Sequence, residues 1–336
     1  MGRRKTSRVT AKARFLLLVT LTFFGLCTIA RSEESLRILY YFIGGDLESL
    51  GGAASADIEE ILQAEPSSGV RVFIMAGGAY RWRIPEAAEC GTTIFEVQNH
   101  ELVPFARNQE GRIGTGEALD DFIHRCTADG IPWDLVFWGH GMPGMGGIGT
   151  DQTSQDGDSL TLTEIRGVLM NNVHRPRIIG LDVCAMGKLE TAWTLSDCAE
   201  LLIADTLDEP IRGWQHNLYI SNADGQMSND LNAMRAAAVS YRERSTGEIS
   251  AVILNMAGIR DRIAGPLQKL VHIAPIPEKD ILVSELLHQC ADPDLSLQWE
   301  EALEGQDLLI PSINQLTEDD YRDMAGLGDV LRNWQR

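Results

Sequence analysis

The chain is long enough for one large domain with an added region, and it is strongly acidic. Its 336 residues include 48 Asp and Glu but only 29 Lys and Arg, which gives a formal net charge of −19 at pH 7. Such a surface repels phosphate groups, so the charge argues against nucleic acid as a partner and favours basic ligands.

The first 30 residues predict an export signal. Basic residues between Arg3 and Arg14 precede an apolar run from Phe15 to Ala30. A run of this length, with a basic start and polar residues after it, is typical of a secretory signal peptide. We therefore expect residues 1–30 to be removed and the protein to be periplasmic or extracellular. The alternative is an uncleaved segment that anchors the protein in a membrane.

Five cysteines follow this segment, and their spacing predicts neither a disulfide framework nor a zinc site. The number is odd, and no two of them form a Cys-x-x-Cys pair. At least one thiol is therefore expected to be free. The five are Cys90, Cys126, Cys184, Cys198 and Cys290.

Strand-like and helix-like segments alternate over residues 35–215. In chain order we expect a strand at 36–43, a helix at 56–64, a strand at 70–75, a hairpin of strands 92–97 and 101–105, a helix at 116–126, a strand before His140, a helix from Thr161 to Asn171, a strand before Cys184, a helix at 188–200 and a strand at 201–204. Thr161 and Glu164 fit a capping box. This alternation predicts an α/β core whose mostly parallel sheet has helices on both faces.

Residues 216–336 are expected to form a largely helical C-terminal region packed on that core. Apolar residues recur at three- and four-residue steps over 229–243 and 248–270, and the tail from Thr317 to Arg336 carries another short amphipathic pattern. Nothing between Ser35 and Arg336 has the composition of a flexible linker.

Two apolar runs end in chemically active residues. Residues 134–139 lead to His140 and residues 177–183 lead to Cys184. Both runs have the composition of buried parallel strands, whose carboxyl ends meet at one edge of a sheet. A thiolate is a nucleophile and an imidazole can exchange protons with it, so the pair predicts nucleophilic catalysis. Either residue alone would more commonly be structural.

The residues around this pair resemble the clostripain-type cysteine peptidases, which belong to the clan with the caspase-like fold. The likeness rests on Trp138-Gly139-His140-Gly141, an acidic loop, and Ile179-Gly180-x-Asp182-x-Cys184-x-Met186. Weaker matches, including Gly213-Trp214, extend it over roughly residues 36–270.

The resemblance implies a cysteine endopeptidase with a caspase-like α/β fold that cleaves polypeptides after Arg or Lys. Cys184 would attack the peptide carbonyl, with His140 as its acid/base partner and the N–H groups of Gly141 and Cys184 as oxyanion donors. Asp182 would form the floor of the S1 pocket that receives the basic side chain, and Asp205 a wall of it. A carboxylate beside Cys184 would raise the pKa of the thiol unless a substrate cation neutralised it.

No cofactor is expected, although some relatives require calcium. Asp151, Asp156 and Asp158 are weak candidate ligands, and a solvated acidic loop is the simpler interpretation because they do not form an EF-hand. The loop from Met142 to Ser159 contains no Lys or Arg, so we expect a single chain without self-cleavage there.

Two other functions stay open. The chain could be a catalytically silent member of the family that binds peptides or proteins. A Gly-Asp-Ser-Leu string that ends at Leu160 also matches a class of esterases, but no strand precedes Ser159 and the companion Asp-x-x-His is missing downstream.

Overall fold

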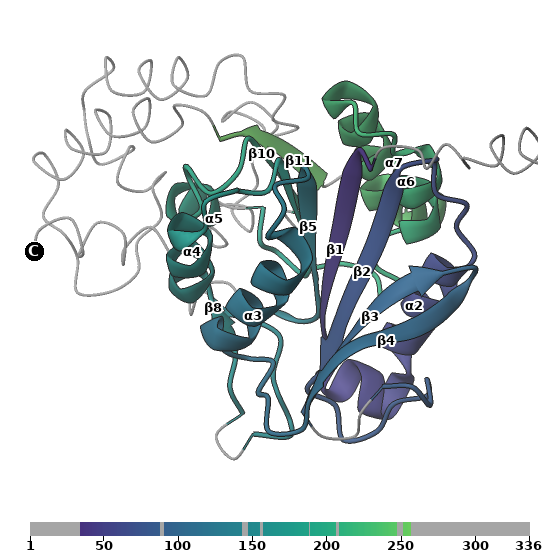
Figure 1. Cartoon of the computed structure of the whole chain (residues 1–336), viewed down its shortest axis with the longest axis vertical. Helices are drawn as coiled ribbons and strands as arrows, with labels where there is room; N and C mark the ends of the chain where they lie inside the picture. The colour runs from purple at the N-terminus through teal and green to yellow at the C-terminus, as the bar shows by residue number, and fades with distance from the viewer. Residues whose placement is uncertain are drawn as a thin grey trace, which may run out of the picture. The chain divides into compact units, whose positions relative to one another are not determined.

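The computed structural model describes residues 34–87, 91–142, 147–154, 157–187, 189–205, 208–246 and 251–256. Their centre is an eight-stranded sheet with the strand order β11-β10-β9-β5-β1-β2-β3-β4 (Figure 1). The strands are β1 (Leu36–Ile43), β2 (Val70–Gly77), β3 (Thr92–Gln98), β4 (Glu101–Asn108), β5 (Trp133–Trp138), β9 (Ile178–Asp182), β10 (Leu201–Asp205) and β11 (Ala251–Asn255).

The inner part of the sheet is parallel, as predicted. Strands β10, β9, β5, β1 and β2 pair in parallel, whereas β3, β4 and β11 add to its two sides in antiparallel fashion. The hairpin of β3 and β4 turns at Asn99 and His100, whose φ angles of 51° and 65° are those of a tight hairpin turn. A separate three-stranded sheet joins β6 (Gly141–Met142), β7 (Gly147–Ile148) and β8 (Leu160–Thr161).

Helices cover both faces of the main sheet, which confirms the predicted α/β class (Figure 1). Successive residues of β1 serve opposite faces: Leu39 and Tyr41 join one apolar core, and Ile38 and Tyr40 join the other. The first core includes α3 (Gly116–Thr127), α4 (Leu162–Asn171) and α5 (Leu189–Thr194). The second includes α2 (Ala53–Leu62), α6 (His216–Asn222) and α7 (Met227–Thr246), and a short helical turn, η1 (Leu47–Gly51), precedes α2.

The predicted start of α4 is confirmed in detail. The hydroxyl of Thr161 accepts the backbone N–H of Glu164 at 3.1 Å, and the Glu164 carboxylate accepts the backbone N–H of Thr161 at 3.0 Å. Two orphan N–H groups at the helix start are thereby satisfied, as expected of a capping box.

Two helix predictions were wrong. Residues 251–255, expected inside a helix over 248–270, form strand β11 and pair with β10. A short apolar run fits either structure by periodicity, and here the open side of β10 provides the pairing partner. The helix expected over 188–200 is limited to α5, Leu189–Thr194. The tail from Thr317 to Arg336 lies outside the described residues, as do Cys90 and Cys290.

No helix in the described ranges is long and apolar enough to cross a membrane. The predicted export signal, residues 1–30, falls outside those ranges.

A buried ionic network ties the strands to the helices of one face. Asp134, on β5, is fully buried and accepts hydrogen bonds from the Arg177 guanidinium at 2.6 Å and the Tyr219 hydroxyl at 2.6 Å. Arg177 also pairs with Asp230 of α7 at 2.7 Å. Removing one partner of such a network leaves an unpaired charge buried in the interior.

We therefore predict that Asp134→Ala lowers the free energy of unfolding by about 3–5 kcal/mol, measured by urea denaturation. Asp121→Ala is the matched control, because Asp121 pairs with Arg125 in solvent and such pairs contribute at most about 1 kcal/mol. Equal small losses in the two variants would contradict the prediction.

Candidate active site

The ends of β5 and β9 bring His140 and Cys184 to the same edge of the sheet. The two strands are parallel neighbours, and Trp138 lies directly opposite Asp182 in their register. His140 and Cys184 each follow two residues after these partners. The structure therefore places the predicted pair on adjacent strand ends at matched positions.

The backbones of the two strand ends touch at Gly141. A Cβ atom added to Gly141 would lie 1.9 Å from the carbonyl oxygen of Cys184 and 2.9 Å from its nitrogen. Only glycine permits this approach. Ala185, directly after the thiol, has a φ of 53°, in the left-handed region that residues with a side chain rarely adopt. Backbone strain of this kind collects at functional sites.

His140 has a partner that the sequence did not reveal. Its Nε2 lies 2.8 Å from Oδ1 of Asp46, and both side chains are partly exposed. A carboxylate can only accept, so in the neutral imidazole Nε2–H donates and Nδ1 is left to accept a proton. The available signal was the position of Asp46 just after β1, because β1 is the neighbour of β5 and ends at the same edge.

Cys184 is a free, half-buried thiol in acidic surroundings. The backbone N–H of Glu209 donates to its Sγ at 3.3 Å. Burial raises the pKa of the thiol above its ordinary value, this hydrogen bond opposes the rise, and the carboxylates of Asp208, Asp182 and Asp205 add to it. In the absence of a cation, the site therefore disfavours the thiolate.

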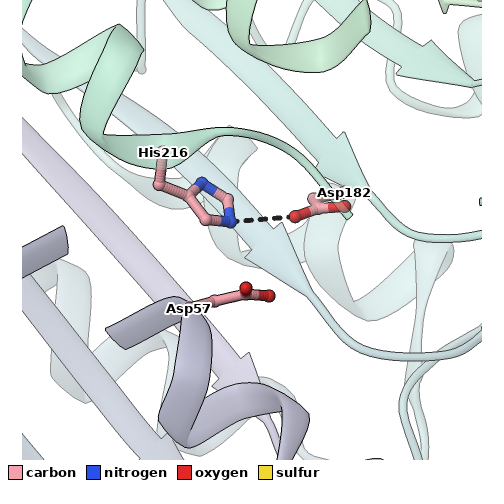
Figure 2. Close-up of side chains that lie close together, drawn as sticks. All are labelled: Asp57, Asp182 and His216. Atoms are coloured by element: carbon pink, nitrogen blue, oxygen red, sulfur yellow. Dashed lines mark ion pairs between the residues drawn. The ribbon is translucent and has the colours of Figure 1, made fainter. Parts of the chain in front are cut away.

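Asp182 is buried beneath the strand end and already has a partner, His216. Its carboxylate accepts the backbone N–H of Trp214 at 3.2 Å and pairs with Nε2 of His216 at 3.0 Å (Figure 2). Burial by itself would lower the pKa of His216, but the neighbouring carboxylates, Asp182 foremost, outweigh it and raise that pKa. Asp205 is also buried, at the end of β10. Sequence reasoning did not identify His216.

A second carboxyl group completes this buried cluster. Asp57, on α2, lies beside His216 and Asp182, and one potential ligand atom from each of the three lies within 4.8 Å of the others (Figure 2). In the part of the chain that the structure describes, these are the residues whose geometry could hold a metal ion. His216 pairs with Asp182 at 3.0 Å, and Oδ2 of Asp57 already accepts a hydrogen bond from the Trp138 indole at 2.7 Å.

The weak calcium candidates have structural partners. Asp151 is fully buried and accepts the N–H of Ile113 at 3.0 Å and the hydroxyl of Thr153 at 2.6 Å. Asp158 pairs with Arg112 at 3.0 Å, and Asp156 lies outside the described residues. The expectation of no cofactor stays a prediction, with calcium as its weaker alternative.

Comparisons with known proteins identify the family of this chain. The sequence model described as the clostripain family matches residues 41–256, more than half of the chain. The chain belongs to the clostripain family. A search of curated protein sequences found no match.

Solved clostripain-family structures share the fold. An inactive protease zymogen from Parabacteroides distasonis has a TM-score of 0.61 at 13% identity, with 82% of each chain covered. A secreted cysteine protease from Bacteroides thetaiotaomicron in complex with an irreversible peptide inhibitor has a TM-score of 0.62 at 11% identity, with 89% of this chain and 99% of that chain covered. The caspase-like α/β fold and the family predicted from the sequence are both confirmed.

The acidic surroundings predict how the Cys184 thiol titrates. We expect its rate of alkylation by iodoacetamide, followed by peptide mapping, to reach half its maximum above about pH 8.5, the ordinary pKa of cysteine. Asp208→Asn should lower that midpoint, because Asp208 is the first of the carboxylates that raise the pKa. Asp121→Asn, on α3, is the control. A midpoint below that of a free cysteine would contradict this account.

Proposed function

We propose that this chain is an exported cysteine endopeptidase that hydrolyses peptide bonds after Arg or Lys, with Cys184 as nucleophile and His140 as its proton partner. The observation that carries the proposal is the register of β5 and β9, which brings the two residues to adjacent strand ends. The contact of Gly141 with the Cys184 backbone and the bond from His140 to Asp46 support it.

In the proposed reaction, Nδ1 of His140 accepts the proton of the Cys184 thiol as the sulfur attacks the substrate carbonyl. The N–H groups of Gly141 and Cys184 stabilise the resulting oxyanion. The imidazolium then gives its proton to the leaving amine, and the carbon–nitrogen bond breaks to leave a thioester. Water hydrolyses the thioester with His140 as base, which restores the thiol. Asp46 orients the imidazole throughout.

The preference for a basic residue rests on the carboxyl groups near the thiol. Asp182, Asp205 and Asp208 all disfavour the thiolate of Cys184. A substrate cation placed among them removes that penalty, so binding of Arg or Lys and activation of the nucleophile are coupled. We assign Asp182 to the floor of the S1 pocket and Asp205 to its wall. The related protease from Bacteroides thetaiotaomicron binds a peptide inhibitor, which supports a polypeptide substrate for this chain.

A second candidate function is peptide binding without catalysis. Two observations favour it: the pKa of the Cys184 thiol is raised, and Asp182 is paired with His216 inside the protein. A catalytically silent member would bind basic peptides through the carboxylates near Cys184, yet it would form no covalent adduct at Cys184.

The first test compares an arginyl peptide with its citrulline counterpart, which has a similar shape but no charge. We expect hydrolysis of the arginyl peptide alone, complete loss of it in Cys184→Ala, and modification of Cys184 by an arginyl acyloxymethyl ketone. Hydrolysis that persists in Cys184→Ala would exclude the proposal. Retention of arginyl peptide without modification of Cys184 would establish the silent alternative.

The second test concerns the S1 assignment. Asp182→Asn keeps the shape of the side chain and removes its charge, so we expect kcat/KM for the arginyl peptide to fall about tenfold or more, a loss of at least about 1.4 kcal/mol of transition-state binding. The rate of Cys184 alkylation by iodoacetamide should not fall in the same variant. A parallel fall in both would mean that Asp182 supports the site without binding the substrate cation.

The third test concerns Asp46. Asp46→Ala removes the group that orients His140, and we expect kcat for the arginyl peptide to fall roughly tenfold while KM changes little, because the contribution of a general acid and base depends on its placement. Asp46→Glu, which keeps a carboxylate to accept Nε2–H, should restore part of kcat, whereas Asp46→Asn should not, because its amide group can donate to Nε2 and fix the wrong tautomer. Unchanged kcat in Asp46→Ala would remove Asp46 from the mechanism.

A further inference from the structure

The residues that precede the catalytic pair are held by buried polar contacts from the helices of one face. Trp138 ends β5, and its indole N–H donates to Oδ2 of Asp57 at 2.7 Å. Asp182 ends β9 and pairs with His216 at 3.0 Å. Trp138 and Asp182 are partners in the strand register, so both contacts act at the same level of the sheet.

These contacts come from separate helices that meet beneath the strand ends. Asp57 is on α2 and His216 begins α6, and both are at least nine-tenths buried. Figure 2 shows the Asp57 carboxyl reaching from its helix toward the ion pair of His216 and Asp182. The ring of Phe42 stacks on Trp138 with centroids 5.2 Å apart and meets the edge of His216 at 6.3 Å. The cluster therefore packs against the aromatic ring of Phe42.

We propose that Asp57, Trp138 and His216 are positioning residues that hold the ends of β5 and β9 so that His140 and Cys184 meet. This inference rests on the proposed function and extends it to side chains that touch neither substrate nor thiol. Each strand end has a side-chain anchor from a helix: Asp57 acts on the His140 strand through Trp138, and His216 acts on the Cys184 strand through Asp182. A shift of about 1 Å at either end would separate the reacting atoms, which can cost roughly 100-fold in rate.

The protonation state of Asp57 follows from its surroundings. Burial is the main reason that its pKa is raised to about 8; His216 of α6 lowers the pKa, Asp182 of β9 raises it, the hydrogen bond from Trp138 of β5 lowers it, and Glu60 of α2 raises it. The phenol of Tyr40, on β1, packs edge-on against His216. At neutral pH Asp57 therefore carries its proton, and a neutral carboxyl still accepts the Trp138 N–H.

Above pH 8 the neutral form is lost. Ionisation gives Asp57 a negative charge, and its carboxyl group lies within 4.8 Å of a carboxyl oxygen of Asp182, so that both groups compete for His216. Because the pKa of Asp57 is raised to about 8, Asp57 is mainly protonated below pH 8 and mainly ionised above it. We therefore expect the placement of the two strand ends to worsen as pH rises through about 8.

The experiment uses four variants of the full chain. Asp57→Asn imitates the neutral carboxyl, Asp57→Leu removes the acceptor, and Trp138→Phe removes the donor. Trp133→Phe is the matched control, because Trp133 begins the same strand and its buried indole N–H has no hydrogen-bond partner among the residues that the structure describes. The two readouts are kcat and KM for the arginyl peptide, and the rate of Cys184 alkylation by iodoacetamide, which needs no substrate.

We expect Asp57→Leu and Trp138→Phe each to lower kcat roughly tenfold or more with little change in KM, and their combination to lose no more than either alone, because both break one contact. Trp133→Phe should keep kcat. Asp57→Asn should match the natural chain at pH 7 and exceed it by up to about tenfold at pH 9, where only about a tenth of Asp57 would retain its proton.

The outcomes separate this inference from the proposed function. If the natural chain hydrolyses arginyl peptide but Trp138→Phe behaves like Trp133→Phe, or Asp57→Asn follows the pH profile of the natural chain, the positioning role is wrong and the peptidase stands. If neither the natural chain nor any variant hydrolyses the peptide, the proposed function fails, and the rate of Cys184 alkylation then tests the positioning role. Slower alkylation in Trp138→Phe than in Trp133→Phe would support that role, and equal rates would overturn it. If Asp57→Leu fails to fold, Trp138→Phe and Asp57→Asn still test the positioning role.

Discussion

The parallel pairing of β5 with β9 is the constraint on which the rest of the site depends. Its register sets Trp138 against Asp182, and therefore His140 beside Cys184, although more than forty residues separate the members of each pair. A shift of this register by one residue would turn every side chain of one strand to the opposite face and separate the imidazole from the thiol. The buried ionic network of Asp134, Arg177 and Tyr219 ties the same two strands at their beginning.

Charge is distributed unevenly at the edge where these strands end. His140 and its partner Asp46 lie in contact with solvent, whereas the side chains of Asp182 and His216 are buried at the sheet edge. The carboxylates around Cys184 work against its ionisation. A thiol in such surroundings would gain nucleophilicity only when a cation reached the site.

Sequence reasoning succeeded where the signal was local or was carried by composition. The apolar strands before His140 and Cys184, the hairpin turn at Asn99 and the capping box at Thr161 all depend on residues within a few positions of one another. It failed at β11, because a short apolar run has no period of its own and its structure depended on the open side of β10. Asp46 was missed for a similar reason, since its partner is 94 positions away.

The sequence by itself determined the family, the α/β class and the two candidate catalytic residues, His140 and Cys184, because each of these follows from residue types at strand ends and from motif spacing. Only the tertiary structure decided what surrounds them: that Asp46 contacts His140, that His216 pairs with Asp182, and that Asp57 accepts a hydrogen bond from Trp138. These contacts join separate strands and helices across the sheet edge. Partner choice between distant segments depends on how the layers pack, and no short-range pattern records it.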